Sequence, residues 1–134
     1  MLKPFFISFV SFIVLDFIWL GFVMKDFNLR QLAEIGRIEN GTFQILYVPA
    51  LLTYILMALA VTFFVLPKAA ETDPWWQLGL WGALLGLIVY GVFDLTNLAI
   101  LKNYPVPFII ADMAWGTAVF AIVSVLTRKL QLTF

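Results

Sequence analysis

Three aspartates that stand inside otherwise apolar stretches are the residues of this sequence best suited to chemistry. They are Asp16, Asp94 and Asp112. The chain contains no cysteine and no histidine, which excludes disulfides, thiolate nucleophiles, Fe–S clusters and imidazole metal ligands or proton shuttles. Any chemistry must therefore use carboxyl, hydroxyl, amide, indole or amine groups.

Other polar and aromatic residues have helical spacing around these acids. Tyr90, Asp94 and Asn97 follow an i, i+4, i+7 pattern, so they share one helix face, and Thr96 lies beside them. Two Asp-x-x-Trp segments place a carboxyl and an indole on one side of their helices. The candidate site residues are Asp16, Trp19, Tyr90, Asp94, Thr96, Asn97, Asp112 and Trp115.

The composition indicates that a lipid bilayer surrounds the chain. Hydrophobic residues make up 63% and charged residues 12% of the 134 residues, and the mean hydropathy is +1.02. A soluble domain has about 45–50% apolar and about 25% charged residues. Eight basic residues balance eight acidic ones, so a nucleic-acid partner is not expected.

Four stretches between charged or turn-forming residues are long enough to cross a membrane. They cover about residues 4–24, 43–66, 75–101 and 105–127. The sequence therefore predicts an all-α integral membrane bundle of four antiparallel helices, formed by a single membrane domain over residues 1–134.

The connection at residues 25–42 is the one sizeable loop. Apolar residues recur along it at roughly helical spacing, which predicts a short helix lying on the membrane surface. These residues are Phe27, Leu29, Leu32, Ile35 and Ile38. A solvated connector is the alternative interpretation.

The three aspartates are predicted to lie at one depth. Asp16 and Asp94 precede the lysines that end their spans by nine and eight residues, and Asp112 follows Tyr104 by eight. At about 1.5 Å per residue, all three lie about 12–14 Å below the same membrane face. No Lys or Arg lies within the spans, so at neutral pH we expect most of these acids to carry protons or a cation to lie among them.

The G-x-x-x-G segment formed by Gly82 and Gly86 continues the polar stripe of the third span. Small residues let a neighbouring backbone approach closely, so this stripe is predicted to face protein and not lipid.

Basic residues do not orient the chain, because four fall on each side of the predicted bundle. Lys3, Lys68, Arg128 and Lys129 share one side, and Lys25, Arg30, Arg37 and Lys102 share the other. Local details could decide the orientation, or the chain could insert both ways and form antiparallel dimers.

Three segments carry a resemblance to a known family. The sequences FIVLDFIWLG at 12–21, YGVFDLTNLA at 90–99 and DMAWG at 112–116 are similar to the predicted bacterial membrane proteins of domain-of-unknown-function family 2177. The resemblance covers nearly the whole chain, and the Asp-Leu-Thr-Asn segment is its most specific part. It implies a small four-span protein of the bacterial inner (cytoplasmic) membrane, and it implies no activity.

The favoured functional hypothesis is an intramembrane site for a proton, a metal cation or a small organic cation, serving small-solute transport. Asp16, Asp94 and Asp112 would be the ligands if a metal is bound, and Trp19 and Trp115 could hold a cation against their ring faces. A homodimer is a natural way to enclose a path. No cofactor is expected.

Two alternatives belong to other classes of protein. The acids could only hold helices together in a structural or accessory protein, although an interhelical polar contact contributes about 0.6 kcal/mol against an insertion cost of about 2.5–3.5 kcal/mol per Asp. Paired carboxyl groups could also act as general acid and base on a lipid-like substrate. Catalysis is the less favoured interpretation, because the Gly-x-Gly-Asp pattern of aspartyl intramembrane proteases is missing.

Overall fold

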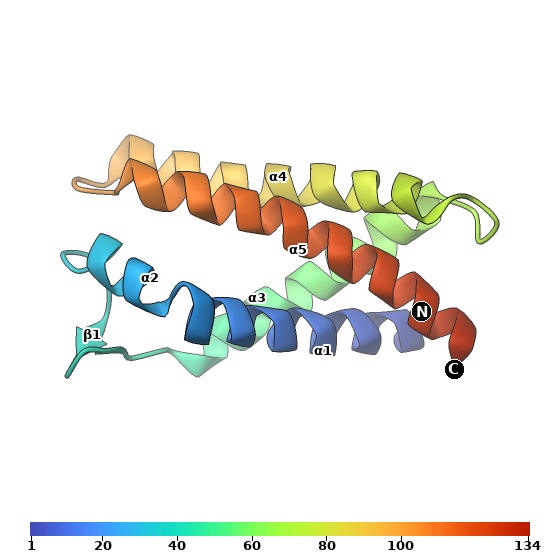
Figure 1. The fold of residues 1–134 in the computed structure, drawn as a ribbon, viewed down its shortest axis with the longest axis horizontal. Helices are drawn as coiled ribbons and strands as arrows, with labels where there is room; N and C mark the ends of the chain where they lie inside the picture. The colour runs from blue at the N-terminus through green and yellow to red at the C-terminus, as the bar shows by residue number, and fades with distance from the viewer.

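Four long apolar helical spans form the body of the protein in the computed structural model, which describes residues 1–134 (Figure 1). They run over Leu2–Val23, Tyr47–Lys68, Trp75–Ile100 and Val106–Thr133. Each has 22 to 28 residues and a mean hydropathy of 1.8 to 2.3, which is long and apolar enough to cross a bilayer. The predicted all-α, four-span fold is confirmed.

The spans include two π-helical turns, and short elements connect them. In chain order the elements are α1 (Leu2–Ile18), the π-helical turn η1 (Trp19–Val23), α2 (Lys25–Gln31), strands β1 (Ile38–Glu39) and β2 (Thr42–Phe43), α3 (Tyr47–Ala60), the π-helical turn η2 (Val61–Val65), the 3₁₀ turn η3 (Leu66–Lys68), α4 (Trp75–Ile100) and α5 (Val106–Thr133). Successive spans run in opposite directions, and both chain termini lie at the same end of the bundle (Figure 1).

Helices α4 and α5 form the most extensive helix pair, and small residues allow their close approach. A Cβ atom added at Gly82 would lie 2.6 Å from the carbonyl oxygen of Phe120, and one at Gly86 would collide with the carbonyl oxygen of Gly116. Gly82 and Gly86 are buried. The prediction that the G-x-x-x-G stripe faces protein is therefore confirmed.

The apolar core lies where α1, η2 and α5 meet. Phe12 packs on Phe120 with ring centroids 4.9 Å apart, and Val61 is fully buried in the same cluster. Nearer the chain termini, the buried Ser8 and Thr127 hydroxyls form a hydrogen bond of 3.0 Å that ties α1 to α5. The first and last spans are thus joined by both apolar and polar contacts.

The connection between the first two spans contains the predicted short helix, α2, but this helix ends at Gln31, before the last of the apolar positions that suggested it. Only α2 is helical, and residues 38–43 form a hairpin in which Ile38 pairs with Phe43. Its turn contains Asn40 and Gly41, both with positive φ, a conformation that these two residue types adopt most readily. The apolar spacing therefore predicted helix wrongly for the residues that follow Gln31.

Two span boundaries also differ from the predicted ones. The second span begins at Tyr47, not near residue 43, because Phe43 belongs to strand β2. The last span continues past residue 127 to Thr133, since no Gly or Pro follows Thr127 to end the helix.

Replacing Gly86 with alanine is expected to destabilise the bundle, because the new methyl group would strike the Gly116 backbone. Overpacking of this kind lowers the free energy of unfolding by about 1–3 kcal/mol. Gly79→Ala is the matched control, since its Cβ would meet only Val125 Cγ2 at 3.5 Å. Denaturant titration in detergent micelles measures both variants, and equal stability of Gly86→Ala and the wild type would contradict the packing described.

Candidate functional site

Asp94 is the most deeply buried acid of the protein, with an exposed fraction of 0%. Its Oδ1 accepts a hydrogen bond of 2.9 Å from the hydroxyl of Tyr104, and Nδ2 of Asn97 donates to that hydroxyl over 3.4 Å. The second carboxyl oxygen of Asp94, Oδ2, is buried and receives no hydrogen bond from a protein donor. An unsatisfied buried carboxyl oxygen is costly, so this atom marks a place where a further proton donor is needed.

Tyr104 reaches Asp94 from the short turn that connects α4 to α5. Asn103 has a positive φ of 60°, which reverses the chain and directs it back toward the bundle. The Tyr104 ring packs with Phe108 and Ile109, and Leu32, which follows α2, covers this group. Burial raises the pKa of the Tyr104 phenol above its ordinary value, so the hydroxyl keeps its proton and remains a donor at neutral pH.

The carboxyl groups of Asp112 and Asp94 are neighbours in the bundle. The two residues come from neighbouring turns of the closely packed α4–α5 pair, and Asp112 is only partly buried. A protonated carboxyl group has one O–H donor, whereas an ionised one only accepts. The pair can therefore hold one proton between its members.

Asp16 of α1 makes its polar contact across the bundle, with α5. Nε1 of Trp115 donates to Asp16 Oδ1 over 2.7 Å. The indole rings of Trp115 and Trp19 stack with centroids 4.4 Å apart and planes inclined by 5°. Trp19 begins the π-helical turn η1, which widens the end of the first span where this stack forms.

Tyr90 joins the groups around Asp16 to those around Asp94. Its ring lies over the bare backbone of Gly116, where any Cβ would collide with it. Its phenol lies near all three carboxyl groups and near the phenol of Tyr54, which is itself a neighbour of Asp16. We call this group the polar cluster: Asp16, Tyr54, Tyr90, Asp94, Asn97, Tyr104, Asp112 and Trp115.

The structure leaves two predicted site residues, Trp19 and Thr96, outside the polar cluster, and Trp19 reaches it only by stacking on Trp115. Thr96 is exposed on the lipid-facing side of α4, because it is two positions from Asp94 and so turned to another face. Thr53, which has a suitable depth, is also exposed and donates to the carbonyl of Pro49 in its own helix. The second span thus contributes its tyrosine and not its threonine.

No group of three or more acidic side chains is arranged to hold a metal ion. The carboxyl groups are distributed over separate hydrogen bonds, with Asp16 committed to an indole and Asp94 to a phenol. Lys102, the basic residue nearest to Asp94 in sequence, is exposed. The chemistry that this arrangement supports is therefore the exchange of protons among carboxyl and hydroxyl groups.

Tyr54 and Tyr104 are the polar-cluster residues absent from the predicted site. Tyr104 had a usable signal, since it lies in a very short connection between two antiparallel helices that each carry an acid near that end. A side chain there can only turn back toward those acids or out into the interface. For Tyr54 the only signal was its depth along the second span, which is weaker.

Tyr104→Phe is expected to destabilise the protein, because Asp94 Oδ1 would lose the hydrogen bond that the Tyr104 hydroxyl donates to it. Leaving a buried acceptor unpaired lowers the free energy of unfolding by about 1–3 kcal/mol. Tyr47→Phe is the control, since Tyr47 is 83% exposed. Thermal unfolding in detergent compares the two variants, and an unchanged midpoint for Tyr104→Phe would show that this bond does not form.

Comparison with known proteins places nearly the whole chain in one family. No curated protein and no solved structure matches the chain. The family model described as "Predicted membrane protein (DUF2177)" matches residues 1–128, which include the first three spans, most of the fourth and every residue of the polar cluster. The chain is thus a multi-pass membrane protein and belongs to the DUF2177 family.

Proposed function

We propose that the polar cluster binds a proton within the membrane and that this binding serves the transport of a small solute. The observation that supports this most directly is the contact between the Asp94 and Asp112 carboxyl groups, with Asp94 Oδ2 buried and lacking a donor. Two adjacent carboxylates in a medium of low dielectric repel each other, and a shared proton removes that repulsion.

The bound cation is a proton in this proposal, and not a metal or an organic cation. A metal ion needs several oxygen ligands in one shell, and the acids are not grouped in that way. An organic cation would need a free aromatic face beside a carboxylate. Trp19 and Trp115 cover each other's inner faces, and the Trp115 N–H is already bonded to Asp16.

The polar cluster also offers a route for the proton to one membrane face. Tyr104 and the partly buried Asp112 lie close to the turn between α4 and α5, whereas Tyr90 leads toward Asp16 and Tyr54. In the opposite direction the route ends at the apolar core of Phe12 and Phe120. Transport would require this core to open, and a homodimer in the bacterial inner membrane would enclose the path better than one four-span chain.

A scaffold role is the second candidate, and it is favoured at Asp16 in particular. The 2.7 Å hydrogen bond between Asp16 and Trp115 links α1 to α5, and neither side chain makes another hydrogen bond of similar length. Asp16 could hold the bundle together while Asp94 and Asp112 bind the proton. The two roles can be separated, because asparagine keeps hydrogen bonding but removes the titratable proton.

Infrared difference spectroscopy of Asp94→Asn and Asp112→Asn tests the proton site. The wild type should show a protonated carboxyl band near neutral pH, and each variant should lose it while remaining at least as thermostable, since asparagine is cheaper to bury. Asp26→Asn is the control, because Asp26 is exposed on α2. Absence of the band from the wild type, or its persistence in both variants, would refute the proposal.

Proteoliposomes containing a pH-sensitive dye test whether the bound proton crosses the membrane. Under an imposed membrane potential, the wild type should acidify or alkalinise the lumen faster than empty vesicles, and Asp94→Asn should not. A wild-type rate equal to that of empty vesicles, over a range of external pH, would exclude uncoupled proton movement. Lowered stability of Asp16→Asn, Asp94→Asn and Asp112→Asn with unchanged infrared spectra would favour the scaffold role.

A further inference from the structure

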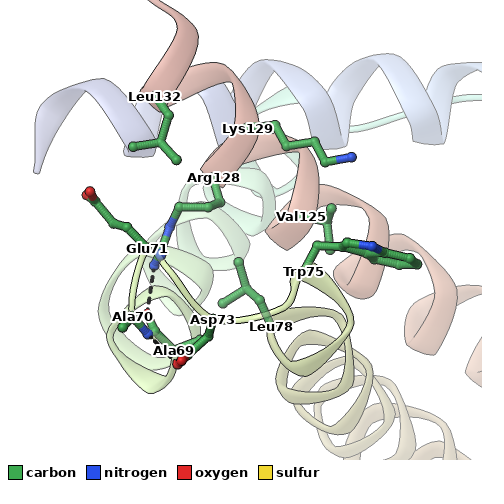
Figure 2. A pocket seen from close by; sticks show the side chains of 10 residues that line it. All are labelled: Ala69, Ala70, Glu71, Asp73, Trp75, Leu78, Val125, Arg128, Lys129 and Leu132. Atoms are coloured by element: carbon green, nitrogen blue, oxygen red, sulfur yellow. Dashed lines mark hydrogen bonds between the residues drawn. The ribbon is translucent and has the colours of Figure 1, made fainter.

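A cavity of about 130 Å³ lies at the end of the bundle that holds the chain termini, at the opposite end from the turn of Tyr104. The segment between η3 and α4 forms one wall, and the first turns of α4 and the last turns of α5 form the other (Figure 2). Its volume is several times what one water molecule needs, so a small polar group fits. Its charged lining residues are Glu71, Asp73, Arg128 and Lys129.

Arg128 is held at this cavity with part of its guanidinium unused. Nη2 donates to the carbonyl oxygens of Leu66 and Ala69 over 2.7 and 3.1 Å, which anchors the side chain against the end of the second span. Nε is buried and has no acceptor. A buried N–H of a charged group is costly when unpaired, so an anionic oxygen that reached Nε would be bound favourably.

Lys129 supplies a second positive charge at the level of the membrane interface. Its Nζ lies 5.9 Å from the ring centroid of Trp75, and Lys68 lies 5.4 Å from the ring centroid of Trp81. Tryptophans of this kind sit at the depth of lipid headgroups. The cavity therefore opens where the phosphate groups of the bilayer are found.

The two acids at the cavity are not used to neutralise the two bases. Asp73 Oδ2 accepts a hydrogen bond of 2.8 Å from the backbone N–H of Ala70, and Glu71 is exposed. Figure 2 shows the Glu71 carboxyl group pointing away from the Arg128 guanidinium. The lining thus presents separate positive and negative regions whose formal charges cancel, which suits a ligand that carries both signs.

We propose that this cavity binds the headgroup of a zwitterionic phospholipid with a primary ammonium group. The phosphate would lie at Arg128 and Lys129, and the ammonium would be bound by the Glu71 carboxylate. Phosphate and guanidinium form strong charge-assisted hydrogen bonds, and a primary ammonium can donate to a carboxylate where a quaternary one cannot. The acyl chains would follow the apolar outer surface of the neighbouring spans.

Native mass spectrometry of the full-length protein in neutral detergent tests this assignment. The probes are short-chain phosphatidylethanolamine, phosphatidylcholine and phosphatidylglycerol, each added separately, and inorganic phosphate. Phosphatidylethanolamine should bind most tightly. Lys129→Gln should weaken its binding about fivefold, the change expected for one basic residue near a membrane surface. Glu71→Gln should weaken phosphatidylethanolamine binding and leave phosphatidylglycerol unchanged.

Lys102→Gln is the matched control, since Lys102 is an exposed lysine at the opposite membrane face. Neither Lys129 nor Glu71 donates or accepts a side-chain hydrogen bond that holds the fold, so their variants should keep the wild-type melting temperature. Equal binding of phosphatidylethanolamine by the wild type and Lys129→Gln would overturn the site. The headgroup assignment would be overturned if inorganic phosphate or phosphatidylcholine bound as tightly as phosphatidylethanolamine. Loss of phosphatidylethanolamine binding in Lys102→Gln alone would overturn it too.

Discussion

The close approach of α4 and α5 is the contact on which the rest of the structure depends. Bare backbone at Gly82, Gly86 and Gly116 removes the side-chain layer that normally separates two helices. The same approach provides the place where Tyr90 lies against Gly116, and it makes Asp94 and Asp112 neighbours. The glycines of α4 and α5 therefore determine which polar groups meet inside the bilayer, where no water solvates them.

Much of this arrangement was predictable because a bilayer restricts a chain so strongly. Span length and the direction reversal between spans predicted one depth for Asp16, Asp94 and Asp112, and helical periodicity was enough to turn Gly86 inward. The contacts within that layer were not predictable. Whether Asp94 would meet an indole or the phenol of Tyr104 depends on helix rotation and on one left-handed residue in a turn. The hairpin at 38–43 was missed because short apolar runs fit strand and helix alike.

The two ends of the bundle use their polar groups differently. Near the turn between α4 and α5, uncharged and acidic groups are paired with one another under an apolar cover, a setting suited to protons. At the other end, basic groups lie against tryptophan rings and backbone carbonyls around an open cavity, a setting suited to lipid headgroups. The apolar contacts of Phe12 with Phe120 separate these two regions. Proton binding and lipid binding would thus be distinct properties of one small protein.

The partners of Asp94 all belong to the hairpin of α4 and α5, whereas the bond between Asp16 and Trp115 joins residues 99 positions apart. This difference bears on how the chain enters the membrane. Two acidic helices that insert as a pair can bury Asp94 and Asp112 as one unit with a single shared proton, before α1 and α3 have packed. The shared proton leaves one negative charge on the pair in place of two, which lowers the cost of crossing before the first two spans complete the bundle.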